Sequence, residues 1–198
     1  MSAIIVLATR NKGKIEELNG MLSEHGIVVK GLDDYPECPE IEEDGETFEQ
    51  NAIKKAETVS KLLGLPALAD DSGLEVDALD GQPGVYSARF AGLNATDRDN
   101  IEKLIALMSA TPVDARQARF RCALAFAAPG QRTWTCSGSC EGEIVLAPRG
   151  HEGFGYDPIF YLPERDLTMA QLTEREKNKI SHRGEAVRKF VTELPRLL

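Results

Sequence analysis

Ile4-Ile-Val-Leu-Ala-Thr-Arg-Asn-Lys-Gly-Lys14 joins a compact apolar run to a polar segment. The apolar part, Ile4–Ala8, is rich in β-branched side chains and predicts a buried strand. Beyond the polar part, Ile15, Leu18 and Leu22 recur at helical spacing and predict an amphipathic helix. A strand that leads directly into a helix is typical of proteins that combine a sheet with flanking helices.

The same two periodicities continue along the chain. Strands are expected at residues 27–29 and 66–69, and helices at 48–63 and 97–108. Residues 119–127 and 134–140 alternate apolar and polar around a turn at Pro129-Gly130, which predicts an antiparallel hairpin. Residues 32–46, 80–96 and 150–163 are expected to be loops, and the C-terminal third is expected to be helical with a break near Ser181. The pattern predicts an α/β protein with a mixed central sheet flanked by helices, and residues 1–198 fit a single domain.

Composition limits the possible partners. The formal net charge is −9, so the surface repels polyanions, and an anionic substrate needs a local group of cations. We therefore expect no nucleic-acid partner. The apolar run near the N-terminus is too short and lacks the basic start of a signal peptide, and no stretch is long enough to span a bilayer. The four cysteines lack paired metal-ligand spacing, so reduced thiols in a cytoplasmic protein without a membrane partner are expected.

The segment Thr9–Lys14 lies where the first strand meets the first helix. Such a junction presents unpaired backbone N–H groups and the positive end of the helix dipole, which together favour a phosphate. Thr9 and Asn11 add side-chain hydrogen bonds, and Lys14 adds a charge one turn into the helix. A polar helix cap with solvated lysines is an equally good interpretation of this segment alone.

Two groups of carboxylates are candidates for chemistry. Asp70 and Asp71 follow a predicted strand, and adjacent strand residues point to opposite faces. One of them could hold Mg²⁺ or take a proton from water, while the other anchors nearby backbone. The competing interpretation is a turn that ends the strand. Glu42 and Glu43 precede the second helix, where they either bind Mg²⁺ or merely favour the helix dipole.

Two later segments are candidates for recognition of a base. Gly153-Phe-Gly-Tyr-Asp157 combines glycines, which allow close backbone approach, with aromatic rings that can stack on a flat ligand. Its alternative is a loop whose aromatic rings cover the core. Lys177–Arg183 concentrates cations and a histidine in an acidic chain, and the alternative is an exposed basic helix start with a structural histidine.

Taken together and in this order, these segments resemble the non-canonical purine nucleoside triphosphate pyrophosphatases, the inosine triphosphatase (dITP/XTP pyrophosphatase) group. The resemblance covers nearly the whole chain. It is carried by Thr9-x-Asn11-x-x-Lys14, Glu42–Phe48 with Asn51-Ala52, Ala69-Asp-Asp-Ser-Gly-Leu74, Pro83–Arg89, Gly153–Phe160 and Ser181-His-Arg-Gly184. One departure is Arg10, where the family often has a small or neutral residue.

The resemblance implies an elongated fold of two lobes with a central cleft, and a homodimer. It implies that Asp71 is the proton acceptor and a Mg²⁺ ligand, that Ser72 touches the substrate, and that Glu42 is the preferred second ligand. Contacts with phosphate or sugar are implied for Thr9, Arg10, Asn11, Lys12, Gly13, Lys14 and Lys177. The base pocket is implied to contain Phe154, Gly155, Tyr156, Asp157, His182 and Arg183.

The implied activity is Mg²⁺-dependent cleavage of ITP, dITP or XTP to the monophosphate and pyrophosphate. A 6-oxo purine presents a hydrogen-bond acceptor where adenine presents a donor, so donors such as Arg183 would distinguish the two. Two other functions use the same residues differently. A non-catalytic nucleotide-binding module would not need Asp71, and a phosphatase acting on the terminal phosphate would release orthophosphate.

Overall fold

The structure is a computed structural model, and it describes residues 3–198. Within these residues one sheet has the strand order β2-β1-β3-β4-β5-β6-β7. Its strands are β1 (Ala3–Leu7), β2 (Ile27–Lys30), β3 (Ala67–Val76), β4 (Gln117–Ala127), β5 (Trp134–Ile144), β6 (Phe160–Leu162) and β7 (Leu167–Thr168). β1 pairs in parallel with β2 and β3, whereas β6 pairs antiparallel with β5 and β7. The predicted mixed sheet is therefore confirmed.

The α-helices are α1 (Lys12–Ser23), α2 (Phe48–Leu63), α3 (Asp97–Met108), α4 (Glu174–Ile180) and α5 (His182–Leu197). The chain divides into two compact units. Unit 1 consists of Met1–Asp71, Cys122–Gly138 and Arg183–Leu198, and unit 2 consists of Ser72–Arg121 and Ser139–His182. β3, β4 and β5 each contribute residues to both units.

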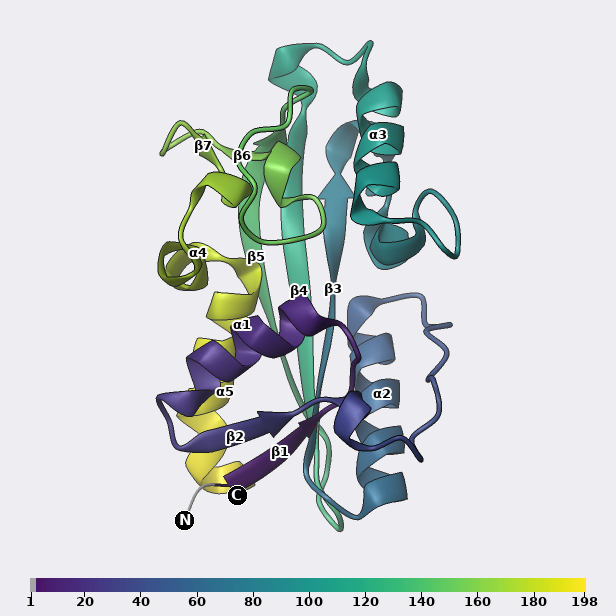
Figure 1. The fold of residues 1–198 in the computed structure, drawn as a ribbon, viewed down its shortest axis with the longest axis vertical. Coiled ribbons are helices and arrows are strands. Elements are labelled where there is room, and N and C mark those ends of the chain that lie inside the picture. Colours follow the sequence, from purple (N-terminus) through teal and green to yellow (C-terminus); the bar gives the residue numbers. More distant parts are fainter. Residues whose placement is uncertain (1–2) are drawn as a thin grey trace. The chain divides into compact units, whose positions relative to one another are not determined.

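In unit 1, successive side chains of a strand point to opposite faces of the sheet, so the buried side chains form two clusters. Ile5 and Leu7 of β1 pack in one cluster with residues of α1 and α5, whereas Val6 and Ala8 pack in another with residues of α2. In Figure 1, α1 and α5 lie to the left of β3 and α2 lies to its right. Each of the two faces of the sheet is thus covered by its own helices.

In unit 1, α2 has the predicted bounds 48–63, and α1 contains Ile15, Leu18 and Leu22 as predicted. Asn11 caps α1, and its Oδ1 accepts from Lys14 N at 3.1 Å. Thr47 caps α2 in the same way, with Oγ1 accepting from Gln50 N, and α2 ends at Gly64. Capping and apolar spacing together therefore define both helices.

The competing interpretation of Asp70-Asp-Ser-Gly73 as a turn that ends the strand is wrong. β3 runs without interruption from Ala67 to Val76, and the four residues lie inside it. A turn of this composition forms when an aspartate side chain binds backbone two residues further on. Here the carboxylates of Asp70 and Asp71 instead bind cations from other elements, so the strand continues.

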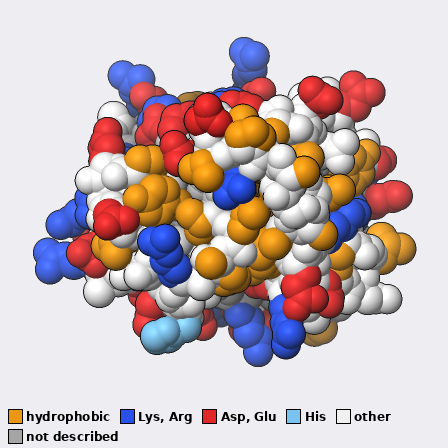
Figure 2. Space-filling view, turned by 90° about the horizontal axis from the view of Figure 1, so that it is seen from above, with side chains coloured by type: hydrophobic (Ala, Val, Ile, Leu, Met, Phe, Trp, Pro, Cys, Tyr) orange, Lys and Arg blue, Asp and Glu red, His pale blue; other side chains and the backbone are white. Residues whose placement is uncertain are grey.

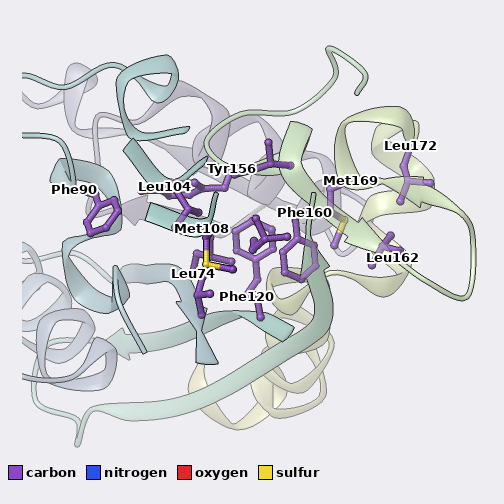
Figure 3. Packing of buried hydrophobic residues seen from close by; sticks show 14 residues of the cluster. Leu74, Phe90, Leu104, Met108, Phe120, Tyr156, Phe160, Leu162, Met169 and Leu172 are labelled. Atoms are coloured by element: carbon purple, nitrogen blue, oxygen red, sulfur yellow. The ribbon is translucent and has the colours of Figure 1, made fainter. Parts of the chain in front are cut away.

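Unit 2 has its own apolar core, drawn in Figure 3. Leu104 and Met108 of α3 are buried in it, and α3 confirms the helix predicted at 97–108. Residues 150–163 are not entirely loop, because β6 begins at Phe160, and residues 84–89 form a 3-10 helix within the predicted loop 80–96. Elements of three to six residues carry too few repeats for a periodicity to reveal them.

No helix within residues 3–198 is long and apolar enough to cross a membrane. All four cysteines are free thiols, and three of them lie in strands. Burial raises the pKa of Cys136 to about 12. Figure 2 shows one face of the molecule, on which acidic and basic side chains are interspersed around the edge. That face offers no continuous basic patch.

Candidate active site

The junction of β1 and α1 is a structured loop. Thr9 Oγ1 accepts from Asn11 N at 3.1 Å, and Asn11 in turn caps the helix. Arg10 extends away from this chain of contacts, and its Nη2 donates to the carbonyl oxygen of Cys38 at 2.8 Å. Lys12 and Gly13 form the start of α1. The segment that the sequence predicts for phosphate contacts therefore lies at a helix N-terminus.

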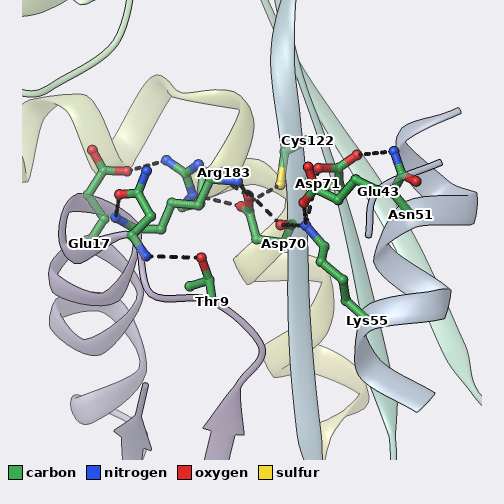
Figure 4. A network of polar contacts seen from close by, with 11 residues as sticks. Thr9, Glu17, Glu43, Asn51, Lys55, Asp70, Asp71, Cys122 and Arg183 are labelled. Atoms are coloured by element: carbon green, nitrogen blue, oxygen red, sulfur yellow. Dashed lines mark hydrogen bonds and ion pairs between the residues drawn. The ribbon is translucent and has the colours of Figure 1, made fainter. Parts of the chain in front are cut away.

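Asp70 lies on the face of the sheet that α1 and α5 cover, and Figure 4 shows its contacts. Its Oδ1 lies 2.7 Å from Lys14 Nζ, and its Oδ2 lies 2.8 Å from Arg183 Nε. Arg183 Nη1 also donates to Glu17 Oε2 at 2.5 Å, and Cys122 Sγ lies 3.2 Å from Asp70 Oδ2. Burial alone would raise the pKa of Asp70, but Arg183 and Lys14 hold it well below its usual value.

Asp71 points to the opposite face, toward α2 (Figure 4). Asn51 Nδ2 donates to its Oδ2 at 3.1 Å, and Lys55 Nζ lies 3.2 Å from its Oδ1. The same ammonium donates to Glu43 Oε1 at 2.5 Å. Burial raises the pKa of Asp71, and although burial opposes the charge on Lys55, Asp71 and Glu43 outweigh it and raise the pKa of that lysine.

Lys14 and Lys55 approach β3 from opposite faces and meet at one backbone atom. Lys14 Nζ lies 3.3 Å, and Lys55 Nζ 2.9 Å, from the carbonyl oxygen of Asp70. Two ammonium groups therefore lie at the backbone of Asp70, next to the buried carboxylate of Asp71. Such an arrangement can bind a phosphate chain and can also accept a proton from water.

A second group of predicted site residues lies in unit 2. Asp157 Oδ2 accepts from Lys177 Nζ at 2.5 Å and from Phe154 N at 3.0 Å. Lys177 Nζ lies 4.8 Å from the centroid of the Phe154 ring. A Cβ at Gly153 would collide with the Asp157 carboxylate, so only glycine fits beside this group. The structure thus brings Phe154, Asp157 and Lys177 together.

Tyr156 and His182 contribute to packing in unit 2. Tyr156 is 5% exposed and belongs to the core, where its hydroxyl donates to the Ser87 carbonyl oxygen at 2.8 Å. His182 is buried and stacks on Phe120, with ring centroids 4.8 Å apart. Tyr156 therefore behaves as a core aromatic, whereas the neighbouring Phe154 stays half-buried.

Several residues of the Asp70-Asp71 network were not predicted as site residues, although Asn51 lies in a motif that carries the resemblance. Asn51 and Lys55 are four residues apart on α2 and lie next to its buried alanines, which is the available signal: polar side chains beside an apolar stripe. Glu17 has the same position relative to Leu18 on α1. Of the glutamate pair, Glu43 contacts Lys55 and Glu42 is exposed.

Asp71 and Glu43 are the candidate ligands for a metal ion. Within residues 3–198, no group of three or more histidine, cysteine, aspartate or glutamate side chains is arranged to hold a metal ion. Asp71 and Glu43 are two carboxylates that share one lysine ammonium. Mg²⁺ typically takes one or two protein carboxylates and completes its coordination with water and phosphate, so this pair fits its requirements.

Comparison with known proteins gives a consistent result. The model of the Ham1 family matches residues 5–193. The dITP/XTP pyrophosphatase of Geobacter sulfurreducens is 51% identical over 183 residues, which cover 92% of each chain, and that of Bacillus licheniformis is 54% identical over 186 residues, which cover 94% of this chain and 95% of the relative. The structure of a HAM1 protein from Coxiella burnetii superposes with a TM-score of 0.87 at 44% identity, covering 98% of this chain and 99% of that one. The chain therefore belongs to the Ham1 family.

Proposed function

We propose that this protein hydrolyses non-canonical purine nucleoside triphosphates, namely ITP, dITP and XTP, to the monophosphate and pyrophosphate. The observation that carries the proposal is the arrangement at β3, where Lys14 and Lys55 meet beside the buried carboxylate of Asp71. Relatives about half identical to the chain carry the name dITP/XTP pyrophosphatase.

In this proposal the chemistry begins with water that attacks the α phosphorus. Asp71 orients this water and accepts its proton, and its raised pKa makes the carboxylate a better base than an ordinary aspartate. Pyrophosphate leaves with high negative charge, which the ammonium groups of Lys14 and Lys55 stabilise. The helix N-terminus at Thr9–Lys14 supplies further donors to the phosphates.

Magnesium is part of the proposal. The carboxylates of Asp71 and Glu43 would hold it, because both have hard oxygen donors and both contact the same buried ammonium. When bound, the ion would neutralise charge on the phosphates and on the leaving group. Glu43 replaces Glu42 as the preferred second ligand, because the side chain of Glu42 is exposed.

Lys177 is proposed to contact phosphate or sugar, and recognition of the base is assigned to Phe154–Asp157, with His182 and Arg183. The buried Asp157–Lys177 pair and the half-buried ring of Phe154 support this role, since they combine a flat apolar surface with fixed polar groups. Arg183 already donates to Asp70 and Glu17, so part of its contribution is structural. Ser72, half-buried directly after Asp71, is proposed to touch the substrate.

The remaining parts of the proposal concern the molecule as a whole. We propose that residues 1–198 act as one domain, and that the protein is a cytoplasmic homodimer. We propose no nucleic-acid partner, which the net charge of −9 supports. We also propose no membrane partner.

A panel of triphosphates tests the function. ITP, dITP, XTP, GTP and ATP are incubated with the protein in Mg²⁺, and in a parallel series with EDTA. We expect pyrophosphate from the first three, much less from ATP, and none with EDTA, because ATP presents a donor at position 6. Binding without turnover would favour a nucleotide-binding module, and orthophosphate would favour a terminal phosphatase. Either result would contradict the proposal.

A further inference from the structure

The loop Gly153–Asp157 of unit 2 carries the side chains proposed to bind the purine base. Two of its residues have backbone conformations that favour glycine, since φ is 74° at Gly153 and 60° at Gly155. A glycine-containing loop loses much conformational freedom when it is ordered. Contacts from outside the loop that hold it in one conformation therefore reduce the entropic cost of binding a ligand.

Two such contacts come from elements far away in the sequence. The hydroxyl of Tyr156 donates to the carbonyl oxygen of Ser87 at 2.8 Å, and this contact is buried. The second joins the backbone N–H of Gly155 to Oδ2 of Asp97 at 2.7 Å. Because Gly155 lies directly after Phe154, the carboxylate of Asp97 restrains the part of the loop that carries the half-buried ring.

Asp97 is the first residue of α3, but other residues, Thr96 and Asp99, cap that helix. Thr96 Oγ1 accepts from Asp99 N at 3.2 Å, and Asp99 Oδ2 accepts from Thr96 N at 2.7 Å. The buried side chain of Asn100 contacts Ala91 N and the Ala88 carbonyl oxygen. In this helical turn, Thr96 and Asp99 cap the helix, whereas Asp97 contacts the loop.

We propose that Asp97 is a positioning residue for the substrate: its carboxylate fixes Gly155 and thereby orders Phe154 and Asp157 for the purine base. This role rests on the proposed function, because it assumes that the loop receives the base. A hydrogen bond from a backbone N–H to an ionised carboxylate is about twice as strong as one between neutral groups. The aspartate is therefore suited to hold Gly155, the residue next to the half-buried ring.

Steady-state kinetics with ITP and hydrogen exchange test the inference on Asp97→Ala, Asp97→Asn and Asp99→Ala. For Asp97→Ala we expect KM to rise about five- to tenfold, as the loss of one solvent-exposed hydrogen bond implies, with kcat within about twofold. Asp97→Asn keeps an acceptor oxygen without the charge, so its KM should lie between those of the wild type and Asp97→Ala. Hydrogen exchange of the peptide that contains Gly153–Asp157 should become faster in Asp97→Ala and stay unchanged in Asp99→Ala.

Asp99→Ala is the matched control, since it removes a cap of the same helix without touching the loop. An unchanged KM in Asp97→Ala, or an equal rise in Asp99→Ala, would overturn the inference, because the effect would then be absent or would act through α3 as a whole. Unchanged exchange in Asp97→Ala would overturn it as well. If the wild-type protein leaves ITP intact, the proposed function fails, and the exchange of the loop still decides whether Asp97 restrains Gly155.

Discussion

Asp71→Asn is expected to lower kcat for ITP by about a hundredfold or more, which is the usual contribution of a general base. The amide cannot accept a proton, although it has nearly the same shape and can still contact Asn51 and Lys55. The measurement is the initial rate of pyrophosphate release at saturating ITP and Mg²⁺. Circular dichroism and the urea midpoint of the same sample report whether the fold is intact.

The stability of this variant is part of the prediction. Burial raises the pKa of Asp71, so the ionised carboxylate is less favourable in the folded protein than in water. A neutral side chain at this position should therefore leave the urea midpoint close to that of the wild type. Turnover near the wild-type rate would remove Asp71 from its role, whatever the stability.

Asp70→Asn, in contrast, is expected to destabilise the protein. Its free energy of unfolding should be lower by about 3–5 kcal/mol, as found when one partner of a buried ion pair is removed. Asp70 is fully buried between Lys14 and Arg183. The amide would remove the charge that Arg183 Nε contacts and would keep the contact of the guanidinium with Glu17. Urea unfolding followed by circular dichroism at pH 7 measures the change.

The pH dependence of stability gives an independent check on Asp70. Its pKa in the folded protein lies well below the unfolded value of about 3.9, so the stability that its charge contributes is present above about pH 4 and is lost as the pH falls further. Asp70→Asn lacks this contribution at any pH. The difference between the two proteins should shrink below pH 4, and a constant difference would contradict the assigned ion pairs.

Much of the fold could be predicted because long elements carry several repeats of their period. α2 shows this well, since four turns of apolar spacing, a threonine cap and a terminal glycine all give the same bounds. β3 could not be predicted as one strand. Its centre, Asp70-Asp-Ser-Gly73, has the local composition of a turn, and the cations that keep it extended come from α1, α2 and α5. Tertiary contacts outweigh local preference there.

The sequence predicts only part of the site, because the rest again depends on tertiary contacts. Alternation in a strand was enough to expect Asp70 and Asp71 on opposite faces, and the structure confirms this expectation. The partners of each carboxylate depend on which helix covers which face, and no local pattern contains that information. Glu43 illustrates the limit, because only the position of Lys55 on α2 distinguishes it from Glu42.

The most direct test of the proposed reaction is hydrolysis of ITP in ¹⁸O-labelled water with Mg²⁺, followed by mass spectrometry of both products. If water attacks the α phosphorus and pyrophosphate leaves, one labelled oxygen appears in inosine monophosphate and the pyrophosphate carries none. Label in the pyrophosphate, or release of orthophosphate with inosine diphosphate, would contradict this chemistry.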